Sequence, residues 1–330
     1  MCGNKIGFKF NKEEDYFMPS YGTFVIELKE EVNNSKLEEL GQTIKEQEII
    51  LGKGEKLDLI RVLKLWTEPL EKVFPTKIKV NDFVKDVVSD KKTVITRKLQ
   101  IAKPRVFIPA FPGTNSEYDS AKVFENAGAI SKIGVFKNLK PQDIESTIEM
   151  FEKEIKNSQI IMFPGGFSAG DEPDGSGKFI ATVFRNPRLK AAIEEHLYER
   201  DGLILGICNG FQVLVKLGLV PYGEIVDMSS ETPTLTFNKI ARHQTRLVTT
   251  KITSKLSPWF NNAYLGQEHV IPISHGEGRF VANESVLKEL EENGQIATQY
   301  VDLNGTASLD IEYCPNSSTW AIEGVTSKDR

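Results

Sequence analysis

Cysteine is scarce in this chain of 330 residues, and its scarcity excludes two kinds of structure. Only three cysteines occur, Cys2, Cys208 and Cys314, and no two of them have a paired spacing. An odd and sparse count argues against a disulfide framework and against a cysteine-rich zinc site. The four histidines form no His-Glu-x-x-His pattern either, so we expect no metal ion.

Charge of one sign and long apolar runs are also lacking. The net charge is −5, which gives no strong electrostatic attraction to nucleic acid or to an anionic membrane. No apolar run approaches the roughly 18 residues of a membrane span, and no basic-then-apolar leader begins the chain. We therefore expect a cytoplasmic protein that binds neither nucleic acid nor membrane.

From about Arg105 onward, short apolar runs alternate with helical patterns. Alternation of this kind predicts an α/β fold with a mainly parallel sheet flanked by helices. Ligands of such sheets bind at the carboxyl ends of the strands. Three loops that follow strands, 111–115, 164–171 and 208–210, are expected to converge there. Strands are predicted at 106–110, 132–136, 159–163 and 203–207, and helices at 116–128, at 141–155, from 187 to just before Gly202, and at 211–217.

The segments before and after this region have different sequence patterns. After Gly223 the chain is β-rich, with strands predicted at 234–237, 246–250 and 269–274. The first hundred residues predict a small α+β segment, with a strand at 21–28 and a helix at 57–66. The resulting division is residues 1–80, a linker at 81–103, and a main domain at 104–330.

Cys208 is the strongest candidate catalytic residue. It lies between an apolar run and a helical pattern, with Gly206 and Gly210 on either side. Small neighbours allow the sharp strand-to-helix turn of a nucleophile elbow. The helix that begins there directs its N–H groups towards the sulfur, and we expect this to favour the thiolate.

His275 and Glu277 are candidates for a base and its orienting carboxylate. In an extended segment, residues two apart project to the same side. Such a pair is suited to base catalysis, with the carboxylate stabilising the imidazolium. The same geometry is equally suited to two side chains that line a pocket wall.

The loop at 164–171 supplies a further element of acyl-transfer chemistry. Its glycines, Gly165 and Gly166, expose main-chain N–H groups after a strand. Together with the N–H of Asn209 they are expected to form an oxyanion hole. The alternative interpretation is a flexible surface loop, which is a common use of glycine.

Three motifs together resemble the glutaminase domain of the phosphoribosylformylglycinamidine synthase family. The resemblance covers about residues 104 to 325, and the loop at 111–117 also resembles the family's first loop. It implies the class I glutamine amidotransferase fold, which is flavodoxin-like. The three motifs are Gly206-Ile207-Cys208-Asn209-Gly210-Phe211-Gln212, residues 164–171, and Pro272-Ile273-Ser274-His275-Gly276-Glu277-Gly278-Arg279-Phe280.

The resemblance also assigns the rest of the chain. Residues 21–28 and 66–76 resemble the end of the family's synthetase part, which implies that residues 1–80 are its tail. The ATP and Mg²⁺ sites of the family lie in that synthetase part, so no cofactor is expected in this chain. The expected partners are glutamine and a synthetase domain or subunit, and the chain is expected to be a fragment or a split subunit.

For the site, the resemblance implies that Cys208 attacks glutamine and forms a glutamyl thioester. Family members carry their catalytic His-x-Glu pair beyond the strand matched by residues 322–325, so the resemblance makes His275 and Glu277 pocket residues and less likely the base and orienter. The residues implied for oxyanion or substrate binding are Gly165, Gly166, Phe167, Asn209 and Gln212.

Two alternative functions remain open from the residues. A cysteine peptidase or another hydrolase can use the same elbow on a similar scaffold. A non-catalytic module that docks on a synthetase is the other alternative. Glutamine hydrolysis compared with peptide cleavage separates the first from a glutaminase, and labelling of Cys208 by a glutamine-like diazoketone argues against the second.

Overall fold

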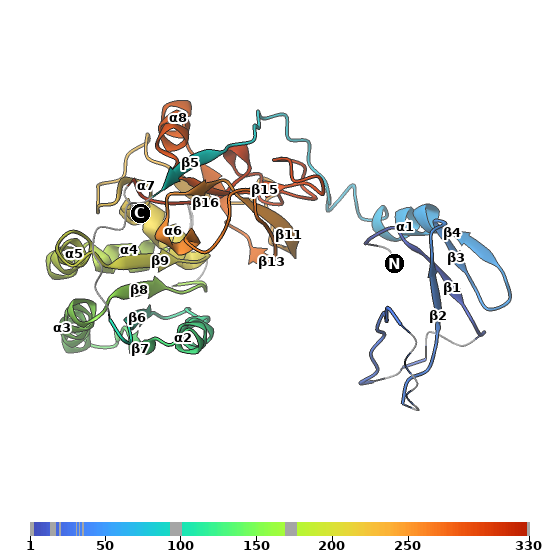
Figure 1. Cartoon of the computed structure of the whole chain (residues 1–330), viewed down its shortest axis with the longest axis horizontal. Coiled ribbons are helices and arrows are strands. Elements are labelled where there is room, and N and C mark those ends of the chain that lie inside the picture. The colour runs from blue at the N-terminus through green and yellow to red at the C-terminus, as the bar shows by residue number, and fades with distance from the viewer. Residues whose placement is uncertain are drawn as a thin grey trace. The chain divides into compact units, whose positions relative to one another are not determined.

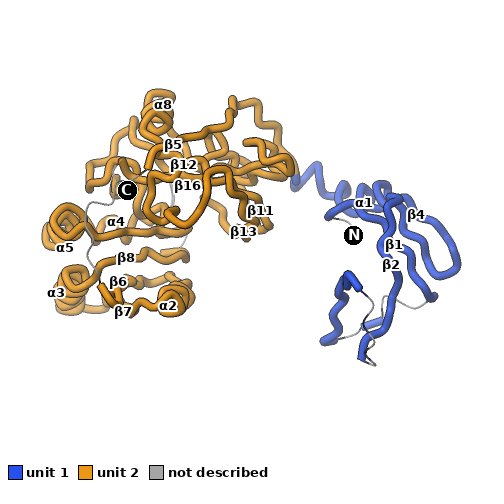
Figure 2. The backbone as a smooth tube through the Cα atoms, viewed as in Figure 1, with its two compact units in different colours: residues 1–76 blue, residues 77–330 orange. Residues whose placement is uncertain are grey.

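The computed structural model describes residues 3–13, 18, 19, 21–30, 32, 34, 36–92, 101–168 and 177–328. The chain forms two compact units, Met1–Thr76 and Lys77–Arg330 (Figure 2). In the described ranges, no helix has the length and apolar character that a membrane span requires. In the same ranges, no cluster of three or more His, Cys, Asp or Glu side chains is arranged to hold a metal ion.

The first unit is a small sheet with one helix. Its strands are β1 (Gly7–Phe10), β2 (Gly41–Ile44), β3 (Glu48–Ile50) and β4 (Lys56–Asp58), in the order β2-β1-β3-β4. Helix α1 (Leu59–Thr67) follows β4, and the Asp58 side chain caps it by accepting from the N–H of Arg61. The helix predicted at 57–66 is thereby confirmed.

The strand predicted at 21–28 is wrong, because these residues form neither strand nor helix. Tyr21, Phe24 and Val25 are exposed instead. A strand needs a neighbour to take its main-chain hydrogen bonds, and β1 to β4 pair only with one another. Apolar residues alone therefore did not make this segment a strand.

The second unit is built around a four-stranded parallel sheet of order β7-β6-β8-β9. Its strands are β6 (Arg105–Ala110), β7 (Ile130–Val135), β8 (Ile160–Phe163) and β9 (Leu203–Gly206). All four were predicted, and the predicted α/β fold is confirmed. Figure 1 shows α3 (Pro141–Asn157) and α5 (Pro187–Glu194) on one side of this sheet and α2 (Glu117–Asn126) on the other.

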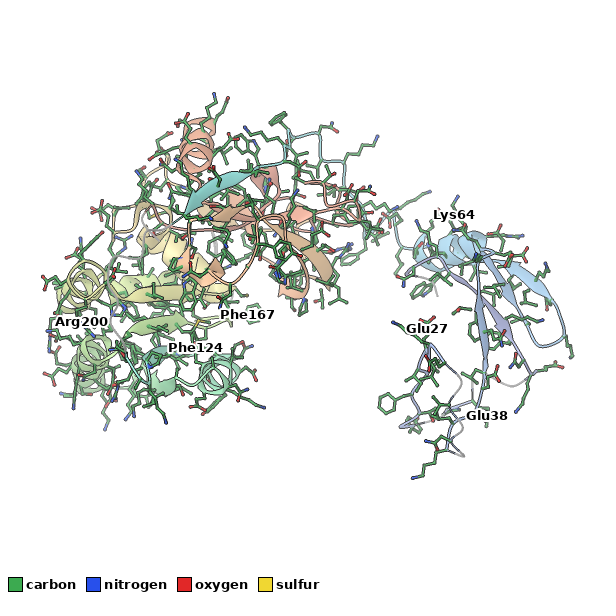
Figure 3. All side chains as sticks on the ribbon, viewed as in Figure 1. Glu27, Glu38, Lys64, Phe124, Phe167 and Arg200 are labelled. Atoms are coloured by element: carbon green, nitrogen blue, oxygen red, sulfur yellow. The ribbon has the colours of Figure 1, made fainter. Side chains whose placement is uncertain are left out.

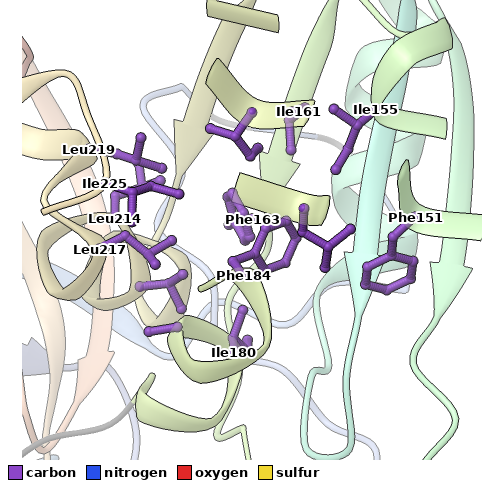
Figure 4. Packing of buried hydrophobic residues seen from close by; sticks show 14 of the residues in the cluster. Phe151, Ile155, Ile161, Phe163, Ile180, Phe184, Leu214, Leu217, Leu219 and Ile225 are labelled. Carbon is purple, nitrogen blue, oxygen red and sulfur yellow. The ribbon is translucent and has the colours of Figure 1, made fainter. Parts of the chain in front are cut away.

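The core of this layer is aromatic. Phe107, Phe151, Phe163 and Phe184 are fully buried between the sheet and the helices. Phe163 and Phe184 meet edge to face, with ring centroids 4.9 Å apart (Figure 4). Phe184 ends helix α4 (Lys178–Phe184). Burial of several aromatic side chains fixes the carboxyl end of β8, from which the glycine loop departs.

A second, antiparallel sheet has the order β13-β11-β15-β16. Its strands are β11 (Gln244–Ile252), β13 (Glu268–His275), β15 (Ile296–Val301) and β16 (Ile322–Val325), and α8 (Glu284–Asn293) precedes β15. Strands β10 (Thr234–Thr236) and β14 (Arg279–Val281) form a separate pair. The strands predicted at 234–237, 246–250 and 269–274 are confirmed as β10, β11 and β13.

Part of the predicted linker at 81–103 packs on the second unit. Strand β5 (Ser89–Lys92) pairs with β12 (Ser254–Lys255), and Val87 is buried. The ammonium of Lys85 lies 4.4 Å from the centre of the Trp320 ring. Residues 85–92 are therefore structured, because partners distant in sequence cover them. Residues 93–100 of the predicted linker lie outside the described ranges.

Candidate functional site

Cys208 lies at the junction between β9 and helix α6 (Asn209–Leu217), with φ 56° and ψ −111°. This backbone conformation is strained for a residue with a Cβ atom. The flanking glycines are required by close approach of the main chain. A Cβ at Gly210 would lie 2.0 Å from the carbonyl oxygen of Phe163, and one at Gly206 would lie 2.5 Å from that of Gly210. The sequence thus forms a tight elbow that presents the sulfur at the carboxyl edge of the sheet.

The loop after β8 packs against the elbow. The N–H of Phe167 donates to the carbonyl of Gly113 at 2.8 Å, and the N–H of Asn115 donates to that of Gly165 at 3.3 Å. A Cβ at Gly165 would lie 3.5 Å from the Cβ of Cys208. The loops predicted to converge, 111–115, 164–171 and 208–210, therefore meet here over their described parts. Residues 169–171 lie outside the described ranges.

Two main-chain donors point at the sulfur. The N–H groups of Asn209 and Gly166 both hydrogen-bond to the Cys208 thiol, and both lower its pKa. Burial acts in the opposite direction and is the largest effect, so the pKa of Cys208 is raised above its ordinary value. The N–H groups at the helix start thus act in the expected direction, but the net shift of the Cys208 pKa is upward. Desolvation by the surrounding walls outweighs the N–H groups, although the residue keeps an exposed face.

A chain of buried side-chain amides joins the elbow to the segment that carries His275. The N–H of Ser168 donates to Oδ1 of Asn209 at 3.4 Å, and Nδ2 of Asn209 donates to Oε1 of Gln212 at 2.9 Å. Nε2 of Gln212 then donates to the carbonyl of Glu277 at 2.9 Å. Because both amide side chains are buried and engaged by the protein, what Asn209 offers a substrate is its main-chain N–H.

His275 ends β13, and Glu277 follows in the turn towards β14. Both ring nitrogens of His275 are shielded from solvent and have no hydrogen-bond partner among the residues described. Burial lowers the pKa of His275, and the nearby His243 lowers it further. The structure thus places His275 and Glu277 next to the elbow helix, but it forms no hydrogen bond from the imidazole to Cys208 or to Glu277.

Phe167, labelled in Figure 3, is 41% exposed on the loop after β8. Its ring centroid lies 6.5 Å from that of His243, whose Nε2 is 2.9 Å from Oγ of Ser274. The glycine loop and the end of β13 therefore face each other across His243. Sequence reasoning gave His243 no role.

A pocket of about 380 Å³ opens beside Cys208 and runs along β9. Its other walls include Thr250 of β11, His269 of β13, and Glu323 of β16. Burial raises the pKa of Glu323, and a hydrogen bond from the Thr298 hydroxyl partly offsets this. Neither His269 nor Glu323 was selected from the sequence. The alternation of β13 was an available signal, since His269 shares a strand face with Ile271, which also lines the pocket.

A cysteine elbow with converging N–H donors, at the carboxyl edge of a parallel α/β sheet, defines a thiol enzyme of acyl transfer. Residues 103–329 match the family model described as "CobB/CobQ-like glutamine amidotransferase domain". The chain belongs to this family of glutamine amidotransferases, and within it to the relatives named phosphoribosylformylglycinamidine synthase subunit PurQ. The resemblance found in the motifs is thereby confirmed.

Two of these relatives show the extent of the match. The protein of Methanococcus maripaludis strain C5 is 34% identical over 226 residues, which span 68% of this chain and 78% of the relative. The protein of Treponema denticola is 35% identical over 236 residues, which span 68% of this chain and 82% of the relative. Among solved structures, a chain of "PurLQS from Thermotoga maritima" is 25% identical with a TM-score of 0.47, over 68% of this chain and 81% of that chain.

Proposed function

We propose that this chain is the glutaminase component of phosphoribosylformylglycinamidine synthase. In this function it hydrolyses glutamine and passes ammonia to a synthetase partner, which converts formylglycinamide ribonucleotide to its amidine in the cytoplasm. ATP and Mg²⁺ would bind to that partner. The observation that carries the proposal is the convergence of the Gly166 and Asn209 N–H groups on the sulfur of Cys208.

The mechanism follows from this geometry. The sulfur of Cys208 attacks the side-chain amide carbon of glutamine, and the carbonyl oxygen becomes an oxyanion beside the two N–H donors. The C–N bond then breaks, the nitrogen takes a proton, and ammonia leaves a glutamyl thioester on the sulfur. Water attacks the thioester through a second oxyanion, which releases glutamate and restores the thiol.

The thiol proton needs an acceptor during the first step. Burial raises the pKa of Cys208, which makes the thiol proton harder to remove than that of an ordinary cysteine. No histidine among the described residues hydrogen-bonds to the Cys208 thiol. Among the described residues, the oxyanion donors lie at the sulfur while the His275 ring nitrogens do not hydrogen-bond to it, so oxyanion stabilisation and thiol activation can be tested separately.

The test compares two nitrogen sources in the complex with the synthetase. Cys208→Ala should abolish amidine formation from glutamine and leave formation from free ammonia unchanged, because only the thioester pathway needs the sulfur. Cys314→Ala is the matched control, since Cys314 is buried and hydrogen-bonds to Asn316 within the protein. Glutamine-dependent synthesis by the Cys208 variant would contradict the proposal.

The two alternatives need separate outcomes. A cysteine peptidase or a general hydrolase would cleave peptides, so ammonia release from glutamine is compared with peptide cleavage in a parallel assay. A docking module without catalysis would support ammonia-dependent synthesis, and Cys208→Ala would have no effect with either nitrogen source. The glycine loop and the family membership favour the glutaminase over both.

A further inference from the structure

The turn from His275 to Gly278 is held by hydrogen bonds at every one of its carbonyl groups. The carbonyls of His275 and Gly276 accept from Asn238, through its Nδ2 at 2.9 Å and its main-chain N–H at 2.8 Å. The carbonyl of Glu277 accepts from Gln212, and that of Gly278 accepts from Nδ2 of Asn316 at 2.9 Å. The end of β13 and the three residues that follow it therefore have every carbonyl group engaged by a hydrogen bond.

Asn238 makes more of these hydrogen bonds to the turn than any other residue described above. In addition to its two donations, its Oδ1 accepts from the N–H of Gly278 at 3.2 Å. Its side chain therefore bridges the first and last residues of the turn, and its Nδ2 also donates to the carbonyl of Arg242 at 3.0 Å. Asn238 is 2% exposed, so water does not replace these bonds when the side chain is changed.

The conformation of the 275–278 turn also determines where the His275 ring lies. A Cβ at Gly278 would be 2.7 Å from Cε1 and Nε2 of that ring, so the imidazole packs directly on the main chain of Gly278. Asn238 holds both the residue that carries the ring and the residue on which the ring lies. Any widening of the turn would move the imidazole.

The turn also contacts both elements that position Cys208. Gln212, one helical turn after the elbow, donates to Glu277. On the other side, His243 lies between Phe167 of the glycine loop and Ser274, the residue before His275. The turn is therefore tied to α6 through Gln212, and the strand that leads into it is tied to the glycine loop through His243.

We propose that Asn238 is a positioning residue of the glutamine site: by closing the His275–Gly278 turn, it holds the wall that places glutamine against Cys208. This inference rests on the proposed function. Asn238 acts through the turn and does not touch the reacting atoms. Its loss should therefore weaken recognition of glutamine and leave the thiol itself as reactive as before.

The experiment uses the full chain and two reagents for Cys208. A glutamine-like diazoketone reports recognition through the concentration that gives half-maximal labelling, whereas iodoacetamide reports only the thiol. Asn238→Asp keeps the shape and the acceptor oxygen but removes the two donations of Nδ2, to the carbonyls of His275 and Arg242, while the main-chain N–H can still donate to Gly276. Asn238→Ala removes the side chain beyond Cβ. We expect both variants to raise the half-maximal diazoketone concentration by about tenfold or more, with iodoacetamide labelling within about twofold of the original.

Gln299→Glu and Gln299→Ala are the matched controls. Gln299 is also buried, and its Nε2 donates to two carbonyls, those of Lys85 and Trp320, while its Oε1 accepts the N–H of Val87. Its variants should lower the melting temperature about as much as the Asn238 variants do, but leave the half-maximal diazoketone concentration unchanged.

The outcomes separate the two levels of the argument. An unchanged half-maximal concentration in the Asn238 variants, an equal rise in the Gln299 variants, or a parallel loss of iodoacetamide labelling would each overturn the positioning role. Failure of both Asn238 variants to fold while the Gln299 variants fold would also overturn it, because the role would then be stability. If the original chain shows no saturable diazoketone labelling, the proposed glutamine site itself is wrong.

Discussion

The elbow makes a quantitative prediction about Gly210. In Gly210→Ala the new Cβ would lie 2.0 Å from the carbonyl oxygen of Phe163 and 2.6 Å from its carbonyl carbon, and contacts below 3.0 Å essentially never occur. The three nearest atoms, all of which the new Cβ would meet below 3.0 Å, are the carbonyl oxygen, carbonyl carbon and Cβ of Phe163 in β8, so no side-chain rotation relieves the clash. The start of α6, with Cys208, must therefore move by about 1 Å, the difference between 2.0 Å and 3.0 Å.

A displacement of this size at a reacting group costs about 100-fold in rate, and the overpacking costs about 1–3 kcal/mol of stability. We therefore expect Gly210→Ala to slow diazoketone labelling of Cys208 at saturation by about two orders of magnitude while the protein remains folded. The assay is the mass of the labelled protein with time, together with a thermal melt.

Gly134→Ala is the matched control. Its Cβ would also meet an atom at 2.7 Å, but that atom belongs to the Phe107 side chain in the core beneath β7. This variant should lose stability and keep the original labelling rate. If Gly210→Ala labels Cys208 at the original rate, or if both variants slow equally, the close approach of α6 to β8 does not position the nucleophile.

Three further predictions concern titrating groups. Burial raises the pKa of Cys314 to about 12, whereas the pKa of a cysteine thiol in the unfolded chain is about 8.5. The stability that the neutral thiol contributes is lost as pH rises between these values, so urea midpoints should fall more steeply from pH 8 to 10.5 in the original than in Cys314→Ala. Burial also raises the pKa of Glu323, so Glu323→Gln should raise the melting temperature at pH 8 and have little effect near pH 4. Finally, His275→Ala should leave the pH midpoint of Cys208 alkylation unchanged, because among the described residues neither ring nitrogen hydrogen-bonds to the thiol.

Each of these has a clear contrary result. Parallel urea profiles for the two proteins would show that Cys314 is not shielded in the folded state. A melting temperature that responds equally to Glu323→Gln at both pH values would show that the carboxyl titrates as in water. A shift of the Cys208 midpoint in the histidine variant would make His275 the partner of the thiol.

The sequence predicted the parallel layer well because each of its elements has a local cause. The helix α3 follows from apolar residues at spacings of three and four, and its buried face includes Ile148, Phe151 and Ile155. The elbow follows from Gly206 and Gly210, which the turn requires for steric reasons within a few residues of Cys208. Local signals of this kind survive in a single sequence.

The features that the sequence did not predict have the opposite origin. Residues 89–92 form β5 because they pair with β12, which lies more than 150 residues later in the chain. No local sequence pattern predicts such a pairing. His269 and Glu323 share a pocket with Cys208 only because two sheets pack against one another. Asn238 belongs to no motif that the sequence analysis singled out. Its proposed role depends on hydrogen bonds to His275 and Gly278, which lie 37 and 40 positions later in the chain.

The sequence by itself determined the alternating strands and helices of the parallel layer and the glycine-flanked elbow at Cys208, because these are local properties, and its motifs carried the resemblance to a glutamine amidotransferase family. Only the tertiary structure decided the direction in which the pKa of that cysteine shifts. The helix start and the two N–H donors favour the thiolate, whereas desolvation by walls from distant parts of the chain favours the thiol and is the larger effect. Desolvation is a sum over all neighbours in space, so its outcome cannot be obtained from the order of residues alone.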